Sequence, residues 1–405
     1  MHSCKSVTPI GRTTRTTSKR NGIIPLSDFL DAPRDFLDAP LGALARALAG
    51  EGPAVEFLPP TAPRSHATLE FASDAPAETG AVVRTSGSTG MPKRTALSVA
   101  ALAANTQITA EFLGFEGQWL LALPLNYVAG LTVLTRGLFA GTRPVATDPG
   151  VHFDAELFNR TAAGMTDRYR ITSLVPTQLQ RLLTNPSPET LATLKRFDAL
   201  LIGGGRTPEW VRDAARAEGL NIFLTYGSAE TTGGCVYNGA PLPGVSVREE
   251  DGRLWLGGPT IATGYLNDPA RTAEHFREFD GERWYVTDDL GTFRNGTVSV
   301  TGRIDDVINS AGIKISASHV QQFVEAFPGV TSALVVPVPH PEWGQSVGLA
   351  LSGDYDDAGL LSAIRSQLGG ACVPKFVWHV DALPLLGNGK PDRLAITEEL
   401  ARHPR

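Results

Sequence analysis

Short apolar runs alternate with helix-like segments between Ala81 and Tyr226, and this rhythm constrains the fold more than any other feature. "QWLLALP", "FDALLIGGG" and "NIFLTYG" are predicted strands, and "TQLQRLL" and "PEWVRDAARAEG" are predicted helices. This order predicts an α/β fold in which helices cover a mostly parallel sheet. Ligands of such sheets bind in the loops after the strands. We therefore expect the loop from Thr85, the turn at 203–205 and the segment after Tyr226 to line one crevice.

The rhythm changes beyond Val236, where "GRLWLGG", "RWYVTDDL" and "TVSVTGR" indicate short antiparallel strands. The residues after Arg303 have a predicted helix, "ASHVQQFVEAF", and strands of their own, "SALVVPV" and "KFVWHV". We predict a large N-terminal domain at 23–303, with parallel-type sheets, helices and a small antiparallel β subdomain. A small mobile α+β C-terminal domain is predicted at 304–405. Residues 1–22 are expected to be a disordered extension, because their basic sequence has no apolar core of a targeting peptide.

The composition excludes several classes of protein. A net charge of -6, without a basic stripe interleaved with aromatic residues, argues against nucleic acid as a partner. No run reaches the roughly 18 consecutive apolar residues of a membrane span, so no integral membrane association is expected. The scattered cysteines Cys4, Cys235 and Cys372 have no C-x-x-C spacing, which favours a reducing cytoplasm over a disulfide framework or a zinc site. A homodimer is allowed by the sequence but not required.

The stretch "VVRTSGSTGMPK" at 82–93 is predicted to hold phosphate. Its glycines let the backbone approach a ligand, its hydroxyls can point inward and its last residue is a cation. The residues of this cradle are Thr85, Ser86, Gly87, Ser88, Thr89, Gly90 and Lys93. The Walker A pattern does not fit, because Met91 and Pro92 separate the second glycine from the lysine. Pro92 also favours an extended or turning segment at the lysine. A surface linker is the alternative, but the apolar run that enters the stretch argues against it.

Four further motifs follow in order: "LTYGSAET" at 224–231, "YVTDDLG" at 285–291, "TGRIDDVINSAGIKIS" at 301–316 and "LLGNGKPDR" at 385–393. With the loop, they resemble the adenylate-forming superfamily of acyl-CoA and aryl-CoA ligases, adenylation domains and luciferases. The resemblance extends from about Ala81 to the C-terminus. It implies that ATP activates a carboxylic acid to an acyl-adenylate, which then forms a thioester with CoA. ATP, Mg²⁺ and CoA are the implied ligands, with ATP and the acid bound by the domain at 23–303.

The resemblance assigns roles to the first motifs. The loop would hold the β- and γ-phosphates, and Glu230 would bind Mg²⁺, which prefers oxygen ligands. Tyr226, Gly227 and Thr231 would hold the nucleotide at the α-phosphate, and Gly204 would also contact the nucleotide. Taken alone, Glu230 would be interpreted as a solvated surface carboxylate.

The later motifs would hold the ribose and move the small domain. Asp289 would bind the ribose hydroxyls, with Asp288 standing where the family has glycine, and Arg303 would support the ribose and phosphate. A surface salt bridge is the plain alternative for this pair. Asp305 matches the hinge between the domains, and Gly312 would line the CoA channel in the second step.

Lys390 matches the family lysine that reaches the substrate carboxylate and the α-phosphate. Lys390, Glu230 and Thr89 are therefore the predicted catalytic residues. The plain alternative for Lys390 is an exposed surface lysine, as most lysines are.

Other segments indicate the acid. "LALPLNYVAGLTVLTRGLFAGTRPV", "ITSLVPTQLQRLL" and "TYGSAETTGGCVYNG" are most similar to the o-succinylbenzoate:CoA ligases of menaquinone biosynthesis, particularly their short actinobacterial-type form. This acid has two carboxylates and an aryl ring, and Arg136 matches an arginine that would bind the carboxylate that does not react. Tyr127 stands where the family often has histidine and can stack on the ring. The glycines that would leave room for the ring are Gly204, Gly205, Gly233 and Gly234.

Two alternatives remain open from the sequence. The first is another aryl- or acyl-CoA ligase, or a free-standing enzyme that loads a carrier protein. The second is a catalytically silent nucleotide-binding protein. The presence of both Glu230 and Lys390 argues against the silent protein.

Overall fold

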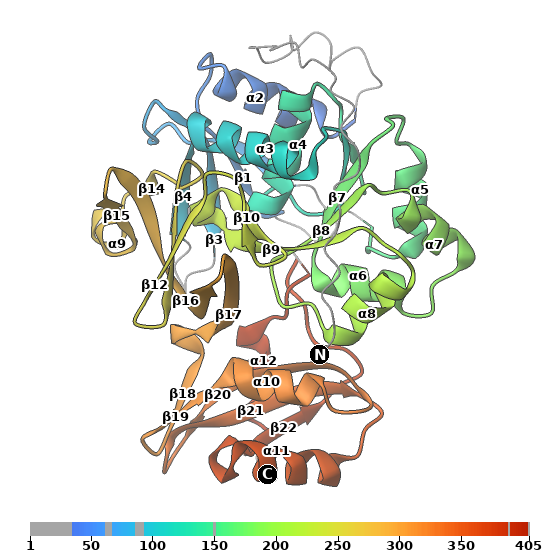
Figure 1. The fold of residues 1–405 in the computed structure, drawn as a ribbon, viewed down its shortest axis with the longest axis vertical. Helices are drawn as coiled ribbons and strands as arrows, with labels where there is room; N and C mark the ends of the chain where they lie inside the picture. The colour runs from blue at the N-terminus through green and yellow to red at the C-terminus, as the bar shows by residue number, and fades with distance from the viewer. Residues whose placement is uncertain (1–34, 61–66, 86–92, 149–150, 388, 404–405) are drawn as a thin grey trace.

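The computed structural model describes residues 35–60, 67–85, 93–148, 151–387 and 389–403. They form a large lobe (up to residue 303) and a small lobe (from residue 304), which lie one above the other in Figure 1. The predicted extension at 1–22, Cys4 and the loop residues Ser86, Gly87, Ser88, Thr89 and Gly90 lie outside the described residues. In the described ranges, no helix is both long and apolar enough to cross a membrane.

The first sheet of the large lobe carries the strands on either side of the predicted phosphate loop. Its strand order is β14-β4-β3-β1-β2. β3 and β4 pair antiparallel, with Thr85 opposite Lys93, because a short connection cannot cross over to make a parallel pair. Lys93 begins a strand, as predicted from Pro92. The elements are α2 Asp38–Leu48, β1 Val55–Leu58, β2 Thr68–Phe71, β3 Thr79–Thr85, β4 Lys93–Ser98 and β14 Gly264–Tyr265.

The second sheet contains the predicted βαβ rhythm. Its order is β11-β10-β9-β8-β7-β5-β6, and the strands from β6 to β9 pair in parallel. β5 and β8 are fully buried, as expected for parallel strands covered on both faces. The elements are α3 Val99–Leu113, β5 Gln118–Leu121, α4 Val128–Ala140, β6 Val145–Ala146, α5 Ala155–Ala163, β7 Arg170–Leu174, α6 Pro176–Leu183, α7 Pro188–Lys195, β8 Ala199–Ile202, α8 Glu209–Ala217, β9 Ile222–Ser228, η1 Ala229–Thr231, β10 Gly233–Tyr237 and β11 Ala240–Pro241.

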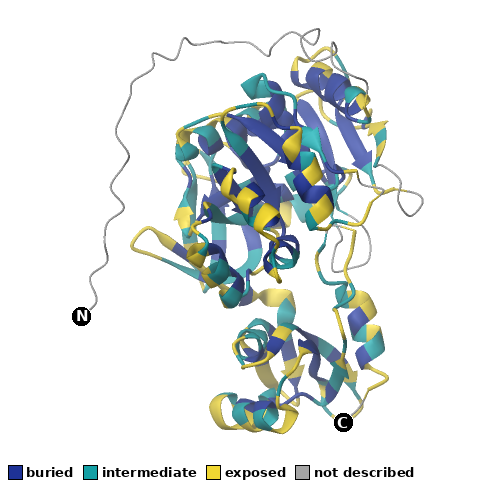
Figure 2. Ribbon diagram, turned by 90° about the vertical axis from the view of Figure 1, so that its right-hand side faces the viewer, coloured by how far each residue is buried: buried dark blue, intermediate teal, exposed yellow. Residues whose placement is uncertain are grey.

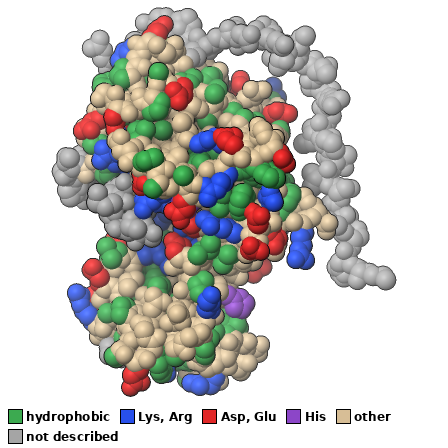
Figure 3. Space-filling view, turned by 90° about the vertical axis from the view of Figure 1, so that its left-hand side faces the viewer, with side chains coloured by type: hydrophobic (Ala, Val, Ile, Leu, Met, Phe, Trp, Pro, Cys, Tyr) green, Lys and Arg blue, Asp and Glu red, His purple; other side chains and the backbone are tan. Residues whose placement is uncertain are grey.

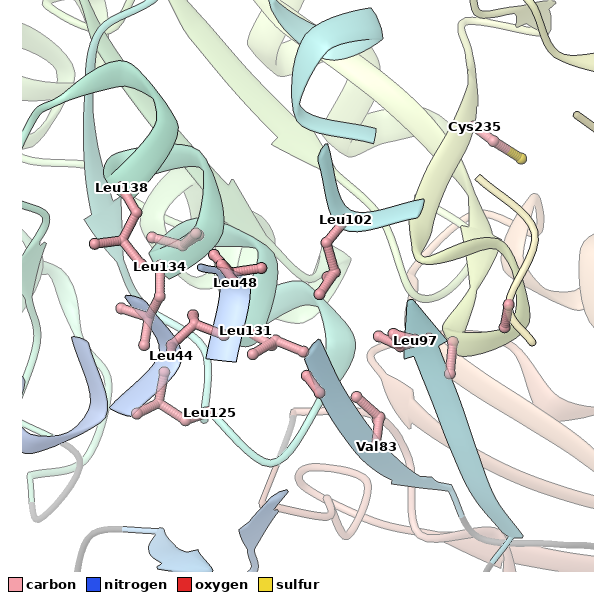
Figure 4. Close-up of a cluster of buried hydrophobic side chains, with 14 of the residues drawn as sticks. Leu44, Leu48, Val83, Leu97, Leu102, Leu125, Leu131, Leu134, Leu138 and Cys235 are labelled. Carbon is pink, nitrogen blue, oxygen red and sulfur yellow. The ribbon is translucent and has the colours of Figure 1, made fainter. Parts of the chain in front are cut away.

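A leucine-rich core joins these two sheets. Figure 4 shows side chains of α2, α3 and α4 pointing toward those of β3 and β4. Leu131 and Leu134 of α4 and Leu97 of β4 are fully buried in it. Because the apolar sides of these helices pack in one core with strands of both sheets, the ends of the two sheets are held in a fixed relation.

The third sheet is antiparallel throughout, which confirms the predicted change of rhythm. Its order is β12-β13-β16-β15, with β17 paired to β16. This pairing places Asp289 directly opposite Arg303. The elements are β12 Ser246–Glu250, β13 Arg253–Gly257, α9 Pro269–His275, β15 Phe276–Phe279, β16 Glu282–Arg294 and β17 Thr297–Arg303.

The small lobe has a sheet and a core of its own. The strand order is β19-β18-β21-β20, with β22 parallel to β21, and a separate cluster of buried side chains lies beneath α10 and α11. Figure 2 shows the two buried interiors separated by a narrower waist. Together with the large lobe, this confirms the predicted fold class. The elements are η2 Ile304–Asp306, β18 Val307–Ser310, β19 Ile313–Ser316, α10 Ala317–Glu325, β20 Val330–His340, β21 Gly344–Gly353, α11 Asp357–Leu368, η3 Gly370–Cys372, β22 Phe376–His379 and α12 Arg393–Leu400.

Candidate active site

The loops after neighbouring parallel strands meet at one edge of the second sheet. Tyr127 follows β5, Val175 follows β7, Gly204 follows β8 and Glu230 follows β9, and these strands are adjacent in the sheet. The carboxyl ends of parallel strands are where such sheets bind ligands. Figure 3 shows acidic and basic side chains mingled on the large lobe just above its junction with the small lobe.

Glu230 lies in the short turn η1 directly after β9. It is 5% exposed, and its Oε1 accepts a hydrogen bond of 2.9 Å from the Tyr265 hydroxyl. Burial and the neighbouring Glu230 carboxylate raise the pKa of Tyr265, so its phenol stays a donor. The Lys93 Nζ lies 5.4 Å from the centre of the same ring. Tyr265 thus contacts both Glu230 and the lysine that ends the predicted phosphate loop.

Glu230 and its surroundings fit a magnesium ion that arrives with a nucleotide. Among the described residues, no group of three or more His, Cys, Asp or Glu side chains gathers to hold a metal. Mg²⁺ at nucleotide sites takes one or two carboxylates, with phosphate and water oxygens completing its shell. One buried carboxylate, with Lys93 over the ring of its Tyr265 partner, therefore suits Mg²⁺ bound to a triphosphate better than a metal held by protein alone.

Thr231 shapes the turn that carries Glu230. Its hydroxyl accepts a hydrogen bond of 2.9 Å from the Ser228 amide and donates one of 2.7 Å to the Gly233 carbonyl. The side chain is fully buried. Thr231 was predicted to lie at the α-phosphate, and its hydroxyl is here engaged by the backbone.

Asp289 is the centre of a second polar cluster. The Tyr226 hydroxyl donates to Asp289 Oδ2 at 2.6 Å, and Arg303 Nη1 donates to Oδ1 at 3.1 Å. Burial raises the pKa of Asp289, although Tyr226 and Arg303 both act to lower it. Burial and Asp289 together raise the pKa of Tyr226, which keeps that phenol protonated. Tyr226 and Arg303, which come from different motifs, thus meet at the Asp289 carboxylate that is predicted to bind the ribose.

Asp288, which stands where the family has glycine, contacts two arginines, and its Oδ2 lies 3.8 Å from Arg303 Nη2. Its Oδ1 accepts a hydrogen bond of 3.1 Å from Arg253 Nη2. Its backbone lies within β16, an extended conformation that any residue adopts. The extended backbone of β16 therefore accepts an aspartate at position 288.

Arg303 connects this cluster to the predicted hinge. Its Nε and Nη2 donate to the two oxygens of Asp305, at 2.8 and 3.0 Å. Burial raises the pKa of Asp305, but the hydrogen bonds and the charge of Arg303, with smaller contributions from the backbone and Arg393, together outweigh burial and lower the pKa. One guanidinium therefore contacts both the ribose candidate and the first turn of the small lobe.

Lys390 comes from the small lobe and lies against the glycine turn after β8. A Cβ placed on Gly204 would lie 3.0 Å from Lys390 Cε and 3.7 Å from its Nζ. Lys390 as a whole is exposed, but the protein around its ammonium excludes water and, with the charge of Arg303, lowers its pKa, whereas Asp289 acts to raise it. The structure therefore brings Lys390, Gly204, Asp289 and Arg303 together. In Figure 1 the red segment before α12 rises toward α6 and β8.

Gly312 is not brought to this cluster. It lies in the exposed turn between β18 and β19, with φ +85°. The neighbouring Ala311 amide donates to the Trp343 carbonyl at 3.0 Å, beside the turn between β20 and β21. The small lobe thus presents its lysine turn, and not its Gly312 turn, to the large lobe.

Arg136 is buried behind β10, the strand that begins with Gly233 and Gly234, and does not lie at an open surface. It is 4% exposed, and its Nη2 donates to Asn105 Oδ1 at 2.8 Å. Asn105 Nδ2 in turn donates to the Gly234 carbonyl at 3.0 Å. Burial lowers the pKa of Arg136, with Tyr237 acting in the opposite direction. Arg136 therefore reaches the predicted acid pocket through Asn105.

The other residues predicted to bind the carboxylic acid are spread around this strand. A Cβ on Gly233 would lie 3.9 Å from the Asn105 amide, and one on Gly205 would lie 3.9 Å from Pro176. Tyr127 precedes α4 and is half-buried, and burial raises its pKa. These residues follow different strands of the same sheet edge.

Sequence reasoning missed Tyr265 and Asn105. Asn105 shares the buried side of α3 with Thr106 and Thr109, so the polar pattern of this helix does not single it out. Tyr265 stands in a two-residue strand without a recognisable pattern.

Comparisons with known proteins agree with this geometry. A family model described as AMP-binding enzyme matches residues 53–266, and one described as AMP-binding enzyme C-terminal domain matches 319–390. A relative from Mycobacterium tuberculosis, named probable 2-succinylbenzoate–CoA ligase, is 36% identical over 370 residues, covering 89% of this chain and 95% of the relative.

Solved structures give the same result. ATP-bound MatB from Rhodopseudomonas palustris has a TM-score of 0.69 and 28% identity, over 83% of this chain and 70% of MatB. The o-succinylbenzoate CoA synthetase MenE from Bacillus subtilis, in complex with the acyl-adenylate intermediate OSB-AMP, has a TM-score of 0.65 and 26% identity, over 84% of this chain and 73% of MenE. With the motifs, the two lobes and the cluster between them, these matches establish that the chain belongs to the AMP-binding enzyme family of adenylate-forming enzymes.

Proposed function

We propose that this chain is an AMP-forming acid–CoA ligase that converts o-succinylbenzoate to o-succinylbenzoyl-CoA for menaquinone biosynthesis. The observation that carries the reaction class is the meeting of Lys390 with Gly204, Asp289 and Arg303 between the lobes. The acid is supported by the relative of nearly equal length that bears this ligase's name. The free, buried Cys235, whose pKa burial raises to about 12, suits a reducing cytoplasm.

The first half-reaction needs two anions to be brought together. The substrate carboxylate attacks the α-phosphorus of ATP, and the bond to the bridging oxygen of pyrophosphate breaks. Lys390 would hold the carboxylate and the α-phosphate together, and Asp289, with Tyr226 and Arg303, would hold the ribose. Preorganised cations at developing charge are among the strongest contributions to catalysis. Mg²⁺ bound beside Glu230 would neutralise the leaving pyrophosphate.

The second half-reaction needs a different face of the small lobe. The CoA thiolate attacks the acyl carbon of the adenylate, and AMP leaves. We propose that the small lobe turns about Asp305, which withdraws Lys390 and brings the Gly312 turn toward the acyl group. Such a turn would have to break the paired hydrogen bonds between Arg303 and Asp305. A few residues that change φ and ψ are the usual means of this motion.

The deciding experiment measures AMP and acyl-CoA formation with ATP, Mg²⁺ and CoA across a panel of acids. The panel contains o-succinylbenzoate, benzoate, a fatty acid and an amino acid. We expect turnover of o-succinylbenzoate alone. Turnover confined to another acid would reject the menaquinone assignment and keep the reaction class, and no adenylation with any acid would reject both.

A second candidate is a ligase for another acid. It is favoured by the TM-score of MatB, which at 0.69 exceeds the 0.65 of MenE, so the fold alone does not select the acid. Replacement of CoA by a carrier protein in the same assay distinguishes a carrier-loading enzyme. We expect no acyl transfer to the carrier.

A further inference from the structure

The turn that presents Lys390 is tied to the large lobe by a hydrogen bond from α6. The Thr177 hydroxyl donates to the Gly389 carbonyl at 2.7 Å, across 212 positions of the chain. Thr177 is half-buried in the first turn of α6, directly after the carboxyl end of β7. The contact therefore joins the edge that holds the nucleotide candidates to the lobe that carries the lysine.

The Gly389 carbonyl and the Lys390 amide belong to the same peptide plane. Because that plane is rigid, fixing the carbonyl of Gly389 also fixes the direction in which the chain enters Lys390. The turn is closed internally as well, since the Leu386 amide donates to the Lys390 carbonyl and the Gly389 amide to the Leu386 carbonyl, both at 2.8 Å. Movement at Gly389 is thus transmitted to Lys390.

Gly389 also permits the close approach of the two lobes. Its φ is +76°, and a Cβ placed on it would lie 2.8 Å from Val175 Cγ2 and 3.2 Å from Thr177 Oγ1. A side chain here would be strained by the backbone and would push the turn away from α6. The lysine turn is therefore seated against the junction of β7 and α6 by shape as well as by the hydrogen bond.

We propose that Thr177 is a positioning residue for the adenylation half-reaction, acting through the Gly389 carbonyl on Lys390. The inference rests on the proposed role of Lys390 in that half-reaction. Thr177 does not contact the reacting atoms in this proposal; it sets where the lysine turn is seated. In the second half-reaction the turn has left the large lobe, so the hydroxyl contributes nothing there.

The same helix supplies a matched control. Thr184, at the end of α6, is exposed, and its hydroxyl donates to the Gln180 carbonyl of its own helix at 2.9 Å. Thr184→Val removes a hydroxyl from α6 without touching the other lobe. Arg206, whose Nη1 lies 3.8 Å from Glu325 Oε2, gives a contact between the lobes that does not involve the lysine turn. Arg206→Gln therefore separates general loosening of the lobes from a specific effect on Lys390.

The test measures each half-reaction with the full-length enzyme and the acid that the wild type turns over. Adenylation is followed by acid-dependent ATP–pyrophosphate exchange, and thioester formation by the reaction of the synthetic acyl-adenylate with CoA. Thr177→Val should slow exchange about fivefold, the scale of one hydrogen bond, and change thioester formation less than about twofold. Thr177→Ser should restore exchange, and Thr184→Val and Arg206→Gln should leave it near the wild-type rate.

Three outcomes would overturn the proposal. They are unchanged exchange in Thr177→Val, equal slowing of both half-reactions, and failure of Thr177→Ser to restore the rate. Gly389→Ala displaces the lysine turn by changing the turn instead of α6, and it provides a second variant should Thr177→Val unfold. It should also slow pyrophosphate exchange more than thioester formation. If the wild type shows no pyrophosphate exchange with any acid, the proposed function itself is rejected. If the wild type shows exchange and Thr177→Val exchanges at the same rate, the proposed function stands without the positioning role.

Discussion

The two ends of the candidate site are built in different ways. The nucleotide end consists of charged and phenolic groups that contact one another directly, such as Asp289 with Tyr226 and Arg303. The acid end is built from glycines, with the buried Arg136 behind them acting through Asn105. Removing a charged group that contacts the ligand directly abolishes that interaction. Removing a buried charged group behind the pocket only changes the shape of the pocket. The two ends should therefore respond differently to substitution.

The largest effect is expected for Lys390→Ala. Adenylation should slow by about 10²- to 10³-fold, because one preorganised charge in the transition state is lost. Thioester formation from the synthetic acyl-adenylate should be largely intact. Pyrophosphate exchange and thioester formation are measured separately, with the surface variant Lys195→Ala as control. Equal loss in both half-reactions would contradict the two orientations of the small lobe.

Asp289→Asn should follow, with an effect on ATP rather than on the acid. A charge-assisted hydrogen bond contributes roughly 1.5–3 kcal/mol, so the KM for ATP should rise about 10- to 150-fold. Asp288→Asn is the matched comparison: Asp288 hydrogen-bonds Arg253 and lies 3.8 Å from Arg303, so its loss should raise the KM for ATP by less than about fivefold, below the effect of Asp289→Asn. A larger effect from Asp288 than from Asp289 would transfer the ribose contact to Asp288.

Arg136→Met tests the acid end and should have a smaller effect. The change leaves Asn105 Oδ1 without its Arg136 donor, a loss of about 1 kcal/mol, so the KM for the acid should rise roughly fivefold. The KM for ATP should not change, because the contact runs to Gly234 and not to the nucleotide cluster. Arg160→Met on the exposed face of α5 is the control. An unchanged KM for the acid would remove Arg136 from the acid end.

The smallest effect is expected in the pH profile of adenylation. The ammonium form of Lys390 is required, and its pKa is lowered from the ordinary 10.5 by burial and by Arg303. The rate should therefore fall as pH rises through a value below 10.5. Lys390→Arg should move this fall to higher pH, since arginine loses its proton only above about 12. Exchange rates against pH give the answer, and identical profiles would show that another group titrates.

The two ends also differ in how much of them the sequence could predict. Asp289, Arg303, Glu230 and Lys390 were predicted from short motifs, because each motif is continuous in the chain and needs no knowledge of packing. Arg136 was predicted to contact the acid directly, whereas the structure places Asn105 between Arg136 and Gly234. A buried side chain acts through its neighbours, and these come from other elements.

By itself, the sequence determined the parallel strands and their helices and the antiparallel third sheet, and it supplied the charged residues proposed for the nucleotide end. These features depend on local periodicity and on residues close together in the chain. Tertiary structure alone decided that Tyr265 holds Glu230, that Asn105 carries the effect of Arg136 to Gly234, and that Thr177 contacts Gly389 from 212 positions away. These partners meet because sheets and lobes pack against each other, and no local pattern records which distant hydroxyl or amide will end up beside a given group.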